Sequence, residues 1–456
     1  MPADGQRRAG VLLPIFSLAQ GAAGLAAAAR GFIDWLVEAG FSVWQVLPVG
    51  PTGADGSPYW LRSDHATHAA LVDRHDHDAG ELRAWHERER AWVDDYALFE
   101  ALAAAHDGAA WQDWPAALRD REPAALDAAR RAHAASIERL VLAQFLADRG
   151  WAELRAYANA RGVALFGDLP IYVAPDSAET WVHRRQFQLG TDGRPLALAG
   201  VPPDYFAADG QLWGNPLYDW AAMAADGYAF WRARVRRALA RFDLLRLDHF
   251  RGLAAYWRVP AGAPTAREGS WEPAGGAALL RALVDDAQGR AQVGEWTFVA
   301  EDLGVITPDV EALRRAFGLP GMRVLQFAFD GSPANPYLPH RHTPDSVVYT
   351  GTHDNDTTLG WYAGLDDATR ARADCLLRAH PGEMPGAMIH AALASVAALA
   401  VIPVADLLGL GSEARINTPG TTSGNWNWTL PPGALDAHLA ARCRHANEAF
   451  GRALLR

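Results

Sequence analysis

Short apolar segments that end on a carboxylate recur in this chain of 456 residues. The three clearest runs end on, or just before, Asp248, Glu301 and Asp354. Consecutive acids are 53 residues apart (301 − 248 and 354 − 301), which leaves room for a helix and loops that return the chain to the start of a parallel neighbour. Acids at the carboxyl ends of successive parallel strands are typical of a (β/α)8 barrel, so this pattern predicts one.

Eight apolar runs rich in Val, Leu, Ile and Phe alternate with helical patterns and are the candidate barrel strands. They cover residues 10–15, 42–49, 163–169, 244–248, 298–301, 322–327, 347–352 and 401–406. An open doubly wound sheet is the alternative. Such a sheet usually has a glycine-rich phosphate-binding turn after its first strand, and no G-x-G-x-x-G occurs in this sequence. We therefore predict the α/β class and a closed (β/α)8 TIM barrel.

Two connections between the expected strands are too long for simple crossovers. Residues 51–161 are rich in Ala, Arg and Trp and predict a helical inserted subdomain, whereas residues 170–243 are rich in Trp, Tyr, Pro and Gly. Insertions of this size after the second and third strands usually form the walls of a cleft. We expect one catalytic barrel domain over residues 1–456 that carries both insertions.

The charge and the residue types exclude several classes of function. The net charge of −11 argues against nucleic acid or an anionic membrane surface as the main partner. The chain has no lysine, so a Schiff base, a P-loop lysine and a lysine general base are impossible. Cys375 and Cys443 lie far apart and lack metal-ligand spacing, which favours free thiols in a reducing compartment.

The N-terminal region allows two interpretations. Arg7 and Arg8 precede a short apolar run and an Ala-rich stretch, as in an arginine-led export signal. That run contains Pro14, however, and leads through an amphipathic segment into the second expected strand, which is the start of a βαβ unit. No run reaches the ~20 apolar residues of a membrane span. We favour a cytoplasmic protein without a membrane segment over an exported one.

The acids differ in their neighbours. Arg246 and Asp248 are two residues apart on a strand and therefore share a face, so the guanidinium can keep the carboxylate ionised, as a glycosyl nucleophile requires. Glu301 would share the face of Val299, and an enclosed glutamate can have the raised pKa of a general acid. Asp302 points the other way, and the two could exchange roles. The alternatives are a structural Arg–Asp pair and a surface acid near a helix.

The third acid follows a flexible turn. Gly351 lets the backbone bend sharply, which would direct His353 and Asp354 into the cleft. Asp354 and Asn355 could equally cap a helix. Asp168 is a fourth acid at the end of an expected strand.

Asp168, Asp248 and Glu301 could instead form a trio that holds Mg²⁺ for enolate chemistry. The missing lysine removes a usual base of that chemistry, and Arg246 would repel a cation beside Asp248. The 18 tryptophans suit stacking against sugars, so a glycoside site is favoured.

A cluster of four histidines among four aspartates resembles a metal-binding site, but its sequence lacks the periodicity of a strand or helix. We interpret it as a solvated loop rather than a metal site. Its members are His65, His68, His75 and His77, with Asp64, Asp73, Asp76 and Asp78.

Several long motifs in the same order resemble the 4-α-glucanotransferases of the amylomaltase (disproportionating enzyme) family, glycoside hydrolase family 77. The resemblance covers nearly the whole chain and its motifs are specific. They are Phe41-Ser-Val-Trp-Gln-Val-Leu-Pro-Val-Gly-Pro-Thr-Gly53, Gly167-Asp-Leu-Pro-Ile-Tyr-Val173, Gly200-Val-Pro-Pro-Asp-Tyr-Phe206, Gly210-Gln-Leu-Trp-Gly-Asn-Pro-Leu-Tyr-Asp-Trp220, and the segments 246–252, 300–309, 351–358 and 409–417.

The resemblance implies a retaining transfer without a cofactor or a metal. It implies that Asp248 attacks the anomeric carbon, that Glu301 is the acid and base, and that Asp354 grips the distorted sugar. It further implies substrate-binding roles for another set of residues: Ser57, Tyr59, Asp168, Gln211, Trp213, Arg246, His353 and Asn417. Tyr59 would stack beneath the reacting ring, and Gln211 and Trp213 would shield the intermediate from water.

The chain departs from the family pattern at residues 60–68 and at Thr429, where an arginine is common. We expect a 4-α-glucanotransferase that acts on α-1,4-glucans and maltooligosaccharides as donor and acceptor, as a monomer or homodimer. A mainly hydrolytic α-glucosidase or amylase and a catalytically silent glucan-binding protein are the alternatives.

Overall fold

The computed structural model describes residues 7–18, 24–53, 55–69, 77–203, 209–287, 296–380, 382–421 and 423–454. Eight parallel strands close into a barrel in the order β1-β12-β11-β10-β9-β6-β3-β2. The strands are β1 (Arg8–Leu12), β2 (Val43–Gln45), β3 (Ala164–Leu169), β6 (Leu244–Leu247), β9 (Phe298–Ala300), β10 (Gly321–Val324), β11 (Ser346–Tyr349) and β12 (Leu399–Pro403). The predicted TIM barrel is therefore confirmed.

All eight predicted strands exist, and their ends differ by a few residues. The strand predicted over residues 322–327 ends at Val324 and continues as a short 3-10 helix, Leu325–Phe327. The last strand begins before residue 401, and the predicted residues 404–406 belong to α14 (Val404–Leu408). Asp248 and Glu301 follow their strands directly instead of ending them.

The barrel has two apolar layers because strand side chains alternate between its faces. The inner layer includes Val43, Phe166, Leu244 and Val299, each fully or almost fully buried. The outward-facing residues, such as Leu245, pack against the surrounding helices in a second, larger core. Near the carboxyl ends of β3 and β6, the polar residues Asp168 and Arg246 face each other in register.

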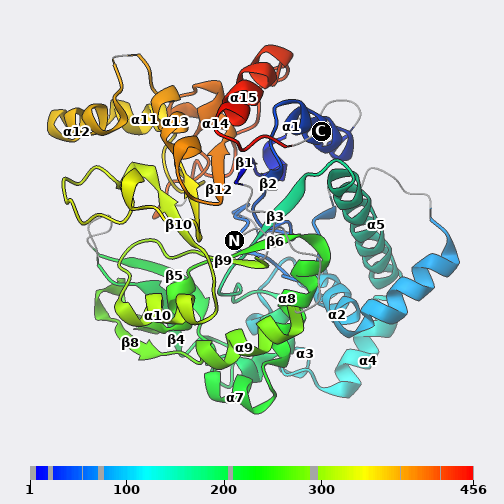
Figure 1. Cartoon of the computed structure of the whole chain (residues 1–456). Coiled ribbons are helices and arrows are strands. Elements are labelled where there is room, and N and C mark those ends of the chain that lie inside the picture. Colours follow the sequence, from blue (N-terminus) through cyan, green and yellow to red (C-terminus); the bar gives the residue numbers. More distant parts are fainter. Residues whose placement is uncertain are drawn as a thin grey trace.

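Helices surround the barrel (Figure 1). Those that follow the barrel strands along the chain are α1 (Leu25–Glu38), α8 (Ala229–Arg241), α9 (Gly276–Ala287), α10 (Pro308–Ala316), α11 (Thr358–Ala363), α12 (Asp367–Leu377), α13 (Gly386–Ala394), α14 and α15 (Ala437–Ala449). Between β2 and β3 lie α2 (Ala79–Ala105), α3 (Ala116–Arg119), α4 (Pro123–Ala132) and α5 (Ala134–Asn159). Helix α5 packs against both α2 and β3, so it links the helical insertion to the barrel.

A second, antiparallel sheet lies beside the barrel with the strand order β5-β4-β7-β8. Its strands are β4 (Ala197–Val201), β5 (Gln211–Pro216), β7 (Ala255–Pro260) and β8 (Ser270–Pro273). The chain between β3 and β4 also holds α6 (Ala178–Val182), and α7 (Trp220–Ala225) follows β5. Strands β4 and β5 come from the connection before β6, whereas β7 and β8 come from the one after it. Two separate connections therefore build this wall, which the composition of residues 170–243 alone did not indicate.

Within the described residues, no helix is both long enough and apolar enough to cross a membrane.

Candidate active site

The predicted acids gather at the carboxyl end of the barrel. Asp248 follows β6, Glu301 follows β9, and Asp354 lies in the loop after β11. Asp168 belongs to β3 itself. The carboxyl ends of parallel strands meet at one end of a barrel, so the topology alone places these four side chains together.

Arg246 joins two of the acids. Its Nη1 lies 2.6 Å from Oδ2 of Asp168 and 2.8 Å from Oδ1 of Asp248, and the guanidinium is almost completely buried. Burial raises the pKa of both carboxyl groups, while the charge of Arg246 opposes that rise. The predicted pairing of Arg246 with Asp248 is present, and Asp168 fixes the guanidinium from the other side.

Tyr59 connects this group to the loop after β11. Its hydroxyl group donates to Oδ2 of Asp168 over 2.6 Å and lies 2.9 Å from Nε2 of His353. Because Tyr59 gives its only proton to Asp168, Nε2 of His353 must donate to the tyrosine oxygen. The two rings stack with centroids 5.3 Å apart and planes 16° apart. Burial lowers the pKa of His353, so its ring is neutral in this network.

Glu301 has different surroundings. Its Oε2 accepts from the backbone N–H of His249 at 2.7 Å, and its Oε1 accepts from the N–H of Leu303 at 2.9 Å. Burial raises the pKa of Glu301 to about 8, against the opposing charge of Arg246. A proton is therefore available on this group at neutral pH.

Asp302 does not share the site of Glu301. Its carboxyl group accepts from the backbone N–H of Met322 at 2.7 Å and lies 3.2 Å from Nε of Arg314. These contacts hold it between β9, β10 and α10. The structure thus settles the register that the sequence left open, because Asp302 points away from the other acids.

Asp354 is held from two sides. Its Oδ2 lies 3.3 Å from Nε2 of His353, and its Oδ1 accepts from Nδ2 of Asn417 over 2.6 Å. Arg415 donates to the backbone oxygen of Asp354 at 2.9 Å. Asn355 accepts from the N–H and the hydroxyl of Thr352, whereas α11 begins at Thr358 with Thr357 as its cap. The alternative that Asp354 or Asn355 caps a helix is therefore wrong.

The remaining predicted residues lie around this network. Ser57 accepts from the N–H of Tyr59 at 3.3 Å and so shapes the turn that presents the ring. Gln211 accepts from Nε1 of Trp213 at 3.1 Å on β5. Among the hydrogen bonds of the described residues, none joins Ser57 or Gln211 to Asp168, Asp248, Glu301 or Asp354. Trp213 lies next to the site because its ring contacts the ring of His249, with the two ring centroids 4.7 Å apart.

The sequence reasoning missed two residues that shape the loop after β11. Asp406, fully buried in α14, accepts from the hydroxyl groups of Thr350 (2.5 Å) and Thr358 (2.7 Å) and from the N–H of Thr358 (2.7 Å). It thus fastens both ends of the loop that carries Asp354. Trp426 places its ring 5.9 Å from that of Tyr59. A buried acid following an apolar strand was the available signal for Asp406, as it was for the other acids.

The interpretation of the histidine cluster as a solvated loop is wrong for His65. This side chain is buried, and its Nδ1 lies 3.1 Å from Glu179. Beside it, Asp64 pairs with the buried Arg234 of α8 at 2.5 Å. Residues 70–76, including His75, lie outside the described residues. No group of three or more potential ligands within the described part of the chain is arranged to hold a metal ion.

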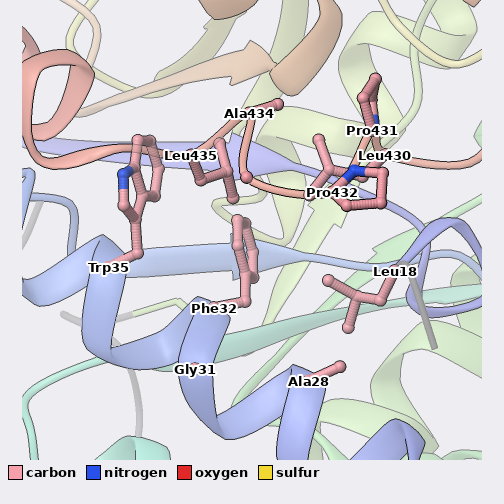
Figure 2. Close-up of a pocket in the computed structure, with 11 residues that line it drawn as sticks. Leu18, Ala28, Gly31, Phe32, Trp35, Leu430, Pro431, Pro432, Ala434 and Leu435 are labelled. Atoms are coloured by element: carbon pink, nitrogen blue, oxygen red, sulfur yellow. The ribbon is translucent and has the colours of Figure 1, made fainter. Parts of the chain in front are cut away.

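An apolar pocket lies elsewhere, between α1 and the segment 430–435 (Figure 2). Phe32 and Trp35 of α1 face Leu430 and Leu435 across it, and Leu18 lies at one end. Its described lining has no carboxyl group, so it does not belong to the acid site.

Enzymes that cleave glycosidic bonds with retention need one carboxylate that is ionised and a second that carries a proton at neutral pH. The contact of Asp248 with Arg246 favours the charged form of the first carboxyl group, and the raised pKa of Glu301 favours the protonated form of the second. The fold and the site together define a carbohydrate-active barrel enzyme.

Comparisons with known proteins specify the family. A family model described as 4-alpha-glucanotransferase matches residues 13–77 and 72–435. The chain is 46% identical to the 4-alpha-glucanotransferase of Thermus thermophilus over 93% of its own length and 94% of that protein. It is 40% identical to the enzyme of the same name from Synechocystis sp., with 98% of each covered. The chain belongs to the 4-alpha-glucanotransferase family, glycoside hydrolase family 77.

A solved structure supports the same assignment. The amylomaltase from Streptococcus agalactiae, in complex with acarbose, superimposes with a TM-score of 0.93 at 31% identity, covering 98% of this chain and 100% of that one.

Proposed function

We propose that this enzyme transfers α-1,4-glucan segments between maltooligosaccharides by a retaining double displacement, with Asp248 as the nucleophile and Glu301 as the acid and base. The observation that carries the proposal is the contrast between these two acids. Asp248 contacts a guanidinium directly, which favours a charged nucleophile. Among the described residues, the hydrogen-bond donors to Glu301 are main-chain N–H groups, and burial raises its pKa to about 8. The family membership described above supports the reaction class.

In the first step, a carboxylate oxygen of Asp248 attacks the anomeric carbon of the donor. The bond between this carbon and the glycosidic oxygen breaks, and Glu301 gives its proton to that oxygen, so the reducing-end fragment leaves as an alcohol. A glycosyl ester on Asp248 remains. In the second step, Glu301 takes the proton of an acceptor 4-hydroxyl group, whose oxygen attacks the same carbon and releases Asp248. Two inversions retain the α configuration.

The other predicted residues hold the sugar. Asp354 is fixed by Asn417 and His353 and would accept hydrogen bonds from ring hydroxyl groups. Tyr59, tied to Asp168 and stacked on His353, offers an aromatic surface beneath the ring.

The acceptor side determines whether a sugar or water completes the reaction. Trp213 on β5 lies against His249, next to both reacting acids, and an apolar ring there disfavours water. We infer that residues 51–161 and 170–243 act as subdomains that wall the cleft of a single catalytic unit.

Incubation with maltotriose, followed by chromatography of the products, tests the proposal. Transfer predicts a ladder of longer maltodextrins together with glucose, and the Glu301→Gln variant should lose this activity while remaining folded. Products limited to glucose and maltose would favour the hydrolytic alternative. If neither pattern appears, the enzyme assignment itself fails. Acarbose, the ligand of the Streptococcus agalactiae amylomaltase structure, should compete with maltotriose.

We further propose a cytoplasmic location, which the free thiols of Cys375 and Cys443 support. We also propose that the enzyme is a monomer or a homodimer. Light scattering during size-exclusion chromatography separates a monomer from a homodimer.

A further inference from the structure

His249, the residue after the proposed nucleophile, has an unusual backbone conformation. Its φ of 44° and ψ of 51° lie in the left-handed region, which is strained for a residue other than glycine. This conformation directs its N–H to Oε2 of Glu301 at 2.7 Å. The strained turn therefore delivers one of the two main-chain donors of the Glu301 carboxyl group.

The ring of His249 is confined by its neighbours. It meets the ring of Trp213 edge to face, with centroids 4.7 Å apart and planes 88° apart. Gly252 also lies close to the ring, because a Cβ atom on this glycine would be 3.0 Å from Cδ2 of His249. Trp213 is itself fixed by Gln211 and lies 6.2 Å from the ring of Tyr172. If Trp213 shifted, the His249 ring could move, and the strained backbone of His249 could then relax.

The ring does not act by proton transfer. Burial, followed by the charges of Arg251 and Arg246, lowers the pKa of His249 to about 3. Its Nε2 is buried and has no hydrogen-bonding partner among the described residues. The ring is thus neutral, and it packs edge to face against Trp213.

We propose that His249 is a positioning residue that couples the place of Trp213 on β5 to the orientation of the Glu301 carboxyl group. With Trp213 in place, the His249 N–H stays directed at Glu301, and with Trp213 displaced the donor is lost. The Glu301 carboxyl group, which serves as both acid and base, would then have its catalytic orientation only when β5 covers the site. This inference rests on the proposed function, because it needs Glu301 to act as the acid.

The coupling has a measurable signature, because an N–H donor stabilises the charged form of a carboxyl group. The charged and titratable groups that face Glu301 are Arg246 of β6, Asp248 directly after β6, Asp302 beside Glu301, and Tyr337. Removal of the His249 ring leaves each of these groups in the protein. The same N–H also lowers the pKa of Asp248, so its loss should raise the pKa of both acids, and the basic limb of the pH profile reports the change at Glu301.

The test is the pH dependence of kcat/KM with maltotriose for His249→Ala and Trp213→Ala. Since two or three N–H donors lower a carboxyl pKa by about two units, loss of one should move the basic limb upward by about one unit in both variants. Arg378→Ala is the matched control, because Arg378 has a φ of 53° and ψ of 39° at the end of α12, away from the site. It introduces alanine into the same backbone region and should leave the limb unmoved.

His249→Asn adds a second readout, because asparagine tolerates the left-handed region but lacks the ring. An intermediate shift of the limb would support a joint role of backbone and ring. An unmoved limb in His249→Ala, with lowered kcat, would show a merely structural residue and overturn the inference. A shift in His249→Ala without one in Trp213→Ala would overturn the coupling. Failure of the proposed function would differ, because the unchanged enzyme would then produce no maltodextrin ladder.

Discussion

Replacement of Glu301 by glutamine should change the pH dependence of stability in a way that the site geometry specifies. In the folded protein the pKa of Glu301 rises from the ordinary 4.5 to about 8 because the group is buried. Between these pH values the folded protein holds a proton that the unfolded chain has released. The free energy of unfolding contributed by Glu301 is thus fully present below pH 4.5 and is lost as pH rises through 8.

The size of the effect follows from the pKa. At about 1.4 kcal/mol per pKa unit, the rise corresponds to about 5 kcal/mol lost by the unchanged protein at high pH. Glutamine does not titrate and avoids this loss, but its NH2 group must face one of the N–H donors of His249 and Leu303, which costs about 1–2 kcal/mol. Glu301→Gln should therefore be the less stable protein by up to about 2 kcal/mol at pH 5 and the more stable by about 3 kcal/mol at pH 9.

Urea unfolding followed by tryptophan fluorescence at pH 5, 7 and 9 measures this difference. Glu87→Gln is the control, because the Glu87 side chain is 78% exposed on α2 and the substitution should change stability equally at each pH. A difference between Glu301→Gln and the unchanged protein that stays constant from pH 5 to pH 9 would refute the argument that burial keeps Glu301 protonated.

Three further substitutions test other parts of the site and the barrel. Tyr59→Phe removes the hydroxyl group that donates to the Asp168 carboxylate. A hydrogen bond to a charged group contributes about 1.5–3 kcal/mol, so kcat/KM for maltotriose should fall about 10- to 100-fold. Unchanged kinetics would exclude a role for the hydroxyl group. Asp406→Ala leaves two hydroxyl groups and one N–H buried without their acceptor, so urea unfolding should show that the free energy of unfolding falls by about 3 kcal/mol. A decrease below ~1 kcal/mol would mean that the loop after β11 keeps its conformation without Asp406. Gly167→Ala would put a Cβ atom 2.3 Å from the Phe242 ring, so it should destabilise the barrel by about 1–3 kcal/mol in the same assay, and a neutral result would show that the ring can move aside.

The barrel and its acids could be predicted because both depend on local sequence patterns. Apolar runs define buried parallel strands, and a chain that leaves such a strand emerges at the functional end of the barrel. The pairing of Arg246 with Asp248 followed from side-chain alternation alone, since the two residues are two positions apart. These inferences needed no knowledge of contacts between distant segments.

The features that were missed depend on long-range contacts. Asp406 acts on Thr350 and Thr358 from another element, and nothing in the local pattern near the threonines indicates it. The burial of His65 follows from Glu179, which is 114 residues away, so a loop rich in His and Asp looked solvated. The left-handed conformation of His249 was equally hidden, because position 249 itself is not the glycine that this conformation favours.

The second sheet limits how this enzyme could exchange parts with its relatives. Strand β4 pairs with both β5 and β7, and four register pairs, from Ala197↔Pro260 to Gly200↔Trp257, join it to β7. A chimera that replaced residues 170–243 alone would give β7 a foreign partner along these four positions. The smallest unit that can be transplanted intact therefore runs from residue 197 to residue 273, and it includes β6 with Arg246 and Asp248. Recombination that alters this wall must carry the proposed nucleophile with it.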